Sequence, residues 1–299
     1  MKHVKGICSL LMLYLVTLPC VLAQQAQQGA ADDTDTLVKQ TQNPVANLIS
    51  LPFQNNLNYP IGPFTRYQNV LNIQPVIPIG ISQQWNLITR TILPVINRQD
   101  PLSKGGTRAG LGDLNATFFL SPAKPGKIIW GVGPVLLIPT ATASVLGTDK
   151  WGIGPSVVAL VQPEGWTIGA ITNNVWSFAG GNNTRVNTTR LPQRFVNGRD
   201  EFSDRGRKVN SFMLQYFVNR NYENGWYLTS SPILTANWEL PPDERWIVPF
   251  GGGIGRVFKM GHQPVNVQVQ NFYNAIHPKT LPHPQWQFRV DFMLLFPEK

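Results

Sequence analysis

Residues 226–238 read W-Y-L-T-S-S-P-I-L-T-A-N-W and show the two-residue periodicity of a β-strand. The even positions are mainly apolar and begin and end with Trp226 and Trp238, whereas the odd positions are mainly polar. A strand of this length, tilted by about 45°, spans about 28 Å. That length matches the apolar band of about 25 Å, edged by aromatic residues, on a transmembrane β-barrel. The stretch therefore predicts one membrane-crossing strand of such a barrel.

The same alternation recurs along the chain and is clearest in the last strand. There, the apolar even positions of 286–296 alternate with Gln287, Arg289 and Asp291. Alternation is poor over 166–176 and moderate over 79–96. We predict an all-β chain that forms an antiparallel transmembrane barrel of about twelve strands. The expected strands are 53–60, 64–78, 85–96, 108–121, 127–140, 150–163, 166–179, 206–219, 226–238, 245–259, 263–275 and 286–296.

The connections between these strands alternate in length. Apart from the first, the odd-numbered connections are long, and the even-numbered ones are mostly short turns. Outer-membrane barrels place long loops outside the cell, and short turns and both termini in the periplasm. This pattern favours an even number of strands and a location in the bacterial outer membrane.

The N-terminus has the features of a secretory signal peptide over residues 1–23. Lys2 and Lys5 precede an apolar run that ends in V-L-A, where cleavage is expected after Ala23. A retained membrane anchor is the alternative. Both cysteines, Cys8 and Cys20, lie within this segment, so the mature chain is expected to contain none. The absence of disulfides fits a barrel that crosses the periplasm unfolded.

Composition supports a membrane barrel more than a soluble enzyme or a nucleic-acid-binding protein. Charged residues make up 14% of the chain, compared with about 25% in ordinary soluble domains. The formal net charge is +9, but the basic residues are scattered through loops of an exported chain. We therefore expect no nucleic-acid partner, and outer-membrane lipids and lipopolysaccharide as the natural surroundings.

Residues 24–52 form a leader before the barrel, which we expect to occupy 53–299. The polar part up to about Gln42 predicts disorder. Asn43 and Pro44 then provide a cap and a first helical position, and Pro52 ends a predicted short amphipathic helix. This helix could lie on the membrane interface, fold into the lumen as a plug, or pack on the barrel rim.

Glycine and proline mark special positions in several strands. The motif W-G-x-G-P occurs at Trp130–Pro134 and again at Trp151–Pro155, and predicts bends or bulges in the wall. The run Gly251–Gly255 could be mistaken for a phosphate-binding loop. Because strand-like sequence follows it, we interpret it as a kinked strand with room for a neighbouring residue.

These motifs resemble those of a family of bacterial outer-membrane proteins. The resemblance rests on G-L-G-D-L at 110–114, both W-G-x-G-P motifs, P-T-A-T at 139–142, G-W-Y-L at 225–228 and V-P-F-G-G-G at 248–253. Members are often labelled "transporter" or "neuromedin U", and the chain is similar to barrels associated with meta-pathway phenol degradation. The resemblance covers about residues 43–299 and implies a barrel with a transport role and no catalytic residues. The ending Pro297-Glu298-Lys299 departs from the terminal aromatic residue that is more common.

The polar face of the strands should line the lumen, since charged side chains facing lipid cost about 2–4 kcal/mol at the membrane centre. Such a lining suits a narrow path for small polar or amphipathic solutes, or it cross-links a closed interior. The residues predicted to face inward are Arg66, Gln68, Asn72, Gln74, Arg90, Asp113, Asn115, Gln268, Gln270, Arg289 and Asp291.

Other candidate sites are weaker. His262, His277 and His283 lack the convergent partners that a metal requires, so we predict neither a metal nor a cofactor. The arginine-rich loop 180–205 could fold inward, bind lipopolysaccharide or remain solvated.

Three functions remain open from the sequence. The preferred hypothesis is a channel or transporter for small solutes. The alternatives are a closed structural or interaction barrel, and an outer-membrane hydrolase that pairs His277 or His283 with a loop serine. The solute and the oligomeric state are not specified by the sequence.

Overall fold

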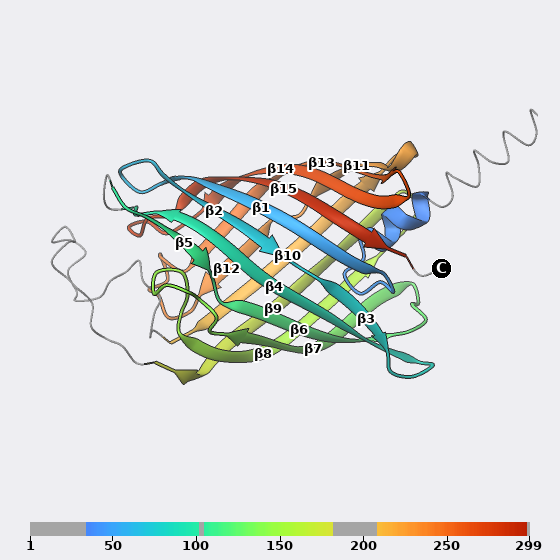
Figure 1. Cartoon of the computed structure of the whole chain (residues 1–299), viewed down its shortest axis with the longest axis horizontal. Helices are drawn as coiled ribbons and strands as arrows, with labels where there is room; N and C mark the ends of the chain where they lie inside the picture. Colours follow the sequence, from blue (N-terminus) through green and yellow to red (C-terminus); the bar gives the residue numbers. More distant parts are fainter. Residues whose placement is uncertain (1–33, 102–104, 182–207, 298–299) are drawn as a thin grey trace, which may run out of the picture.

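The structure, a computed structural model, describes residues 34–101, 105–181 and 208–297. The predicted signal peptide and most of the 180–205 loop lie outside these ranges. The described chain forms a closed antiparallel barrel of 12 strands (Figure 1). Its strands are β1 (Ile49–Ile61), β2 (Arg66–Ile73), β3 (Val76–Gly80), β4 (Trp85–Gln99), β5 (Thr107–Leu111), β6 (Leu114–Pro122), β7 (Ile128–Ile138), β8 (Lys150–Val161), β9 (Trp166–Gly180), β10 (Asn210–Asn221), β11 (Trp226–Ser230), β12 (Ile233–Asn237), β13 (Trp246–Met260), β14 (Gln263–Ile276) and β15 (Pro284–Phe296).

Fifteen segments make twelve barrel strands because β2 with β3, β5 with β6, and β11 with β12 are each one strand interrupted near its middle. Pro75 and Pro232 lie in two of these breaks, where proline supplies no N–H to the ladder. β15 pairs with β1 from Ile49 opposite Phe296 to Ile61 opposite Pro284, which closes the barrel. The predicted fold and the twelve predicted strands are confirmed.

Both described ends of the chain lie at the same end of the barrel, together with the short turns (Figure 1). By the rule for outer-membrane barrels, this is the periplasmic end. The longer connections 139–149 and 277–283 lie at the opposite, extracellular end (Figure 1). No helix in the described ranges is long and apolar enough to cross a membrane.

The two faces of the strands separate as their parity predicts. In β11, Trp226 and Leu228 on the outer face are 41% and 50% exposed, whereas Tyr227 between them is 2% exposed. Large aromatic residues mark the outer surface elsewhere as well, including Trp130, Trp151, Trp166, Trp176, Phe250 and Trp286. The exposed apolar band is the surface that lipid covers in a membrane barrel.

The predicted helix that begins at Asn43-Pro44 and ends at Pro52 is wrong. The helix lies earlier, at residues 34–41, within the stretch expected to be disordered, and β1 begins at Ile49 and includes Pro52. Asn43 instead stabilises a turn, because its Oδ1 accepts a hydrogen bond of 3.0 Å from the Val45 N–H. The Ile49 end of β1 is held by pairing with the end of β15. Pairing with a distant strand therefore decides the structure of this segment.

The two W-G-x-G-P motifs lie on β7 and β8, with Pro134 directly opposite Pro155. The second glycine of each motif lies close to the other neighbouring strand, which is β6 for Gly133 and β9 for Gly154. A Cβ at Gly133 would lie 1.7 Å from the Phe118 carbonyl oxygen, and one at Gly154 would lie 1.6 Å from that of Asn174. The pairings of β6 with β7 and of β8 with β9 are interrupted at these positions. The predicted irregularities in the wall are confirmed.

Candidate functional site

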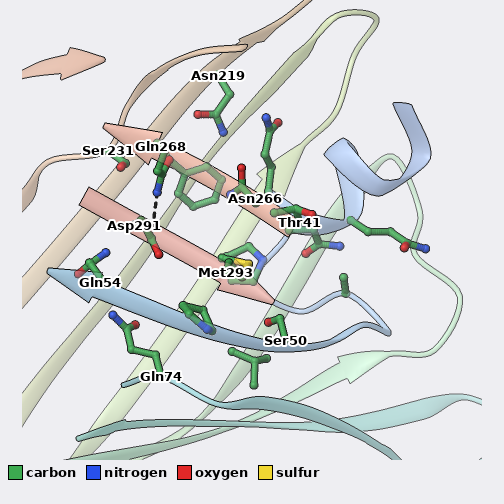
Figure 2. Close-up of a pocket in the computed structure, with 18 of the residues that line it drawn as sticks. Thr41, Ser50, Gln54, Gln74, Asn219, Ser231, Asn266, Gln268, Asp291 and Met293 are labelled. Carbon is green, nitrogen blue, oxygen red and sulfur yellow. Dashed lines mark hydrogen bonds between the residues drawn. The ribbon is translucent and has the colours of Figure 1, made fainter. Parts of the chain in front are cut away.

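The interior of the barrel contains two adjoining cavities. The smaller, about 160 Å³, lies toward the periplasmic end, and the larger, about 620 Å³, opens toward the extracellular connections. Both are lined by Gln54, Gln74, Arg90, Ile171 and Gln215, which therefore mark the place where the cavities meet. In the smaller cavity, Gln54 of β1, Gln268 of β14 and Asp291 of β15 project from different strands into the same space (Figure 2).

Leader residues 40–48 line the periplasmic side of the smaller cavity. Leu37, Val38, Ala46 and Leu48 are buried in an apolar cluster with Tyr227, Val257 and Leu295 of the wall. Val45 joins a second cluster that includes Phe119, Val158, Ile171 and Phe217. Of the three positions considered for the leader, the lumen-facing one agrees with this packing.

Two hydrogen bonds tie the leader to periplasmic parts of the wall. Gln42 Nε2 donates to Asn221 Oδ1 at 2.8 Å, and Gln162 Nε2 donates to the Lys39 carbonyl oxygen at 2.8 Å. Neither contact belongs to a strand ladder, and five apolar side chains of residues 37–48 are buried. The leader is therefore held mainly by its buried apolar side chains.

One side of the interior is a network of hydrogen bonds between strands. Arg289 is fully buried, and its guanidinium donates to Asn56 Oδ1, the Ser231 carbonyl and Gln287 Oε1 at 2.8–2.9 Å. Gln270 Oε1 accepts from the backbone N–H of Ser231 at 3.1 Å. These side chains cross-link β1, β14 and β15 to the segment between β11 and β12. Here the polar face acts as a structural lining.

Tyr227 extends this network toward the periplasm. Its hydroxyl donates to Asn266 Oδ1 at 2.6 Å. Its ring lies against Gly255, where a Cβ would be 2.2 Å from the ring carbon Cζ. The glycine-rich run in β13 thus makes room for a neighbouring aromatic residue, as the sequence predicted.

Arg90 and Asp291 differ from Arg289 because they line the interior cavities. Arg90 Nη2 donates to Gln74 Oε1 at 2.7 Å, and Arg90 lines both cavities. Asp291 Oδ2 accepts from Gln268 Nε2 at 3.0 Å, whereas its buried Oδ1 has no hydrogen-bond partner in the protein. Charged groups of opposite sign therefore lie along one interior route.

The residues predicted to line the lumen fall into three groups: those that line a cavity, those that are hydrogen-bonded within the interior, and two that lie away from the cavities. Asn72, Gln74, Arg90, Asn115, Gln268 and Asp291 line one or both cavities. Gln270 and Arg289 are engaged in the network, and Gln68 Oε1 lies 3.5 Å from its donor, Asn58 Nδ2.

Two of the predicted lumen residues lie away from the cavities. Arg66, at the start of β2, lines neither cavity. Asp113 lies against the 139–149 connection, where its carboxylate accepts from the backbone N–H groups of Ala141 and Thr148. It sits just where the strand breaks between β5 and β6, so the inside–outside alternation that predicted its direction does not apply there.

Several interior residues were missed in the sequence. Gln54, Asn56 and Asn58 alternate with more exposed neighbours along β1, a signal that parity alone could have revealed. Gln215, which alternation puts on the polar face of its strand, and the leader residues lining the smaller cavity were not among the predicted lumen residues either. The apolar residues of the leader allow a plug, but its local sequence does not specify which distant strands they pack against.

The extracellular rim is organised by Glu244. Its carboxylate accepts from the backbone N–H groups of Thr280 and Leu281 at 2.9–3.2 Å, which fixes the 277–283 connection. On this connection His277 and His283 stack with ring centroids 3.9 Å apart. No group of three or more potential metal ligands (His, Cys, Asp, Glu) gathers in the described ranges.

Comparison with solved structures identifies the class of fold. The chain is similar to the COG4313 outer membrane channel from Pseudomonas putida F1, with a TM-score of 0.60, 13% identity, and coverage of 84% of this chain and 96% of that one. The fold is that of the bacterial outer-membrane β-barrels. This agrees with the barrel and the outer-membrane location that the sequence predicted.

More distant likenesses are to the CymD monoaromatic hydrocarbon channel and to the Salmonella typhi outer membrane phospholipase. Their TM-scores are 0.43 and 0.39, their identities 10% and 9%, and each alignment covers 83–84% of this chain and 88–91% of the other. Likenesses at this level do not discriminate between functions. No protein-family model matches the sequence, and a search of curated proteins also gives no match.

Proposed function

We propose that this chain is an outer-membrane channel for small solutes whose lumen is closed at the periplasmic end by its own leader. The observation that carries the proposal is the pair of adjoining cavities along the barrel interior. The larger faces the extracellular connections, and the smaller ends against residues 40–48. A solute that reached the smaller cavity would enter the periplasm only if the leader moved.

The contacts of the leader fit such a removable plug. It is anchored by a small set of buried apolar side chains and by the two wall hydrogen bonds of Gln42 and Gln162. The described leader residues 34–48 belong to no strand, so the leader can move without breaking the ladders that join the strands. The transport role implied by the resemblance to the outer-membrane family labelled "transporter" agrees with this arrangement.

The hydrolase alternative receives less support from the rim. His277 Nδ1 lies 2.9 Å from the Pro278 carbonyl oxygen, and His283 Nδ1 lies 3.0 Å from that of Leu281. Each Nδ1 is thus directed at its own backbone, with no serine hydroxyl hydrogen-bonded to either ring among the described residues. We propose that the chain has no enzymatic activity.

Solute influx into proteoliposomes tests the channel. Replacing Val38 and Leu48 with aspartate should raise the swelling rate several-fold, because the substitutions place charges in the apolar cluster that holds the leader. Thr36→Asp, on the exposed face of the same helix, is the matched control and should leave the rate unchanged. A change in gel mobility on boiling verifies that each barrel is folded. Equal rates for all three proteins would refute the plug, and no influx through any of them would refute the channel.

A further inference from the structure

The larger cavity has two unlike walls. On the β1, β2 and β4 side it is lined by Gln54, Asn72 and Arg90. On the β6–β10 side its described lining carries no charge. Apolar side chains, among them Phe119, Val135, Leu137, Ile171, Val175 and Met213, alternate there with the neutral polar side chains of Asn115, Thr117, Ser156, Asn173, Ser211 and Gln215. A ligand pocket with an apolar wall and a few convergent polar groups selects a molecule that is itself amphipathic.

The charges in this cavity favour an anion. Among the described lining residues, Arg90, Arg98 and Arg245 are cationic, and Glu244 is the only carboxylate. Glu244 already accepts hydrogen bonds from Thr280 and Leu281 of the rim. Positive groups within low-dielectric walls attract and concentrate solutes of the opposite sign.

Arg90 is the cation placed to contact a bound solute. It lies where the cavities meet, and part of its surface is accessible, in contrast to the fully buried Arg289. Among the described residues, its guanidinium donates to the neutral amide of Gln74, and Asp291 attracts it electrostatically without an ion-pair contact of 4.0 Å or less. A guanidinium has five N–H donors in a planar fork that matches a carboxylate. Arg90 can therefore bind a carboxylate without losing an existing ion pair.

The carboxylate of Asp291 disfavours a bound anion in the smaller cavity. Its unpartnered Oδ1 is buried next to the smaller cavity, beyond the level where Arg90 divides the lumen. A carboxylate that moved past Arg90 toward the periplasm would approach this like charge. The favourable position for the anion is therefore on the larger-cavity side of Arg90.

We propose that the larger cavity binds small organic carboxylates with an apolar body, of about the size of a single aromatic ring, and that Arg90 binds the carboxylate. The volume of about 620 Å³ is within the range of small-molecule sites and exceeds what one ring requires. The inference rests on the proposed function, since it names the class of solute for the same lumen. The apolar wall holds the ring, and Arg90 discriminates by charge.

Fluorine NMR of the full-length barrel in a non-ionic detergent tests this with 4-fluorobenzoate and its neutral counterpart, 4-fluorobenzamide. Titrations near pH 7.5 are corrected against empty micelles, because the amide partitions into detergent. The wild type should bind the benzoate at least tenfold more tightly than the amide. Arg90→Gln should remove this preference and Arg90→Lys should keep part of it, because a lysine retains the charge but not the fork.

Arg256→Gln is the control for a general loss of positive charge. Arg256 lies over the Trp226 ring and lines neither cavity, so the preference for benzoate should remain. Equal binding of benzoate and benzamide by the wild type would overturn the proposal, as would an unchanged preference in a folded Arg90→Gln barrel. If Arg90→Gln does not fold, two results still test the proposal: the preference of the wild type for benzoate over benzamide, and the reduction of that preference in Arg90→Lys.

Binding is measured without transport, so this test is independent of the channel. A barrel that prefers benzoate but admits no solute in any leader variant would retain the carboxylate site and refute the channel. A barrel that admits solutes without any preference for carboxylates would retain the channel and refute the site.

Discussion

At the residue scale, the contact between Tyr227 and Gly255 links the shape of the wall to the interior network. Gly255→Val should destabilise the barrel by about 1–3 kcal/mol, because the new side chain would overlap the Tyr227 ring and displace its hydroxyl from Asn266. The temperature at which the folded band is lost on unboiled gels measures this. Gly80→Val is the control, since the nearest atom to a Cβ there is 3.8 Å away. Equal losses for both variants would show that the contact has no special role.

At the element scale, the 277–283 connection should loosen on acidification. The pKa of His283 lies below its ordinary value, first because burial disfavours the charged ring and also because the stacked His277 would repel it. The hydrogen bond to the Leu281 carbonyl and the nearby Glu244 oppose this shift but do not cancel it. The exposed pair of Lys279 and Asp243, 4.0 Å apart, also lies at this rim and contributes little.

The sign of the effect follows from proton uptake. As the pH falls through about 6.5, an unfolded histidine binds a proton that the folded His283 does not, so stability is lost on acidification and is fully present above that pH. Hydrogen exchange of 277–283, corrected for intrinsic rates, should therefore be faster at pH 5 than at pH 7.5. His283→Phe keeps a ring in the stack and should reduce this difference. Equal corrected rates at both pH values in the wild type would contradict the pKa direction.

At the scale of the whole molecule, the sequence predicts the strands of the barrel wall well, but it predicts poorly how the leader packs inside the barrel. Each strand must present apolar residues to lipid and polar ones to the lumen, so parity locates the strands and places Arg289 and Asp291 inside. Parity does not apply where a strand is broken, as at Asp113, and it says nothing of the leader. The position of the leader depends on Val45 and Leu48 meeting wall residues far along the chain. Such packing leaves no periodic signal in the sequence.

The central claim, that the leader closes the lumen, is tested most directly by locking it in place. A Cβ at Gly131 would lie 3.1 Å from Val45 Cγ1, so Val45→Cys with Gly131→Cys brings two thiols within reach of a disulfide. Both native cysteines fall in the predicted signal peptide, so the engineered pair should be the only thiols in the mature barrel. Solute influx should be abolished in the oxidised protein and restored by reducing agent, with either single variant unaffected. Influx that continues at the wild-type rate through the fully oxidised barrel would contradict the account.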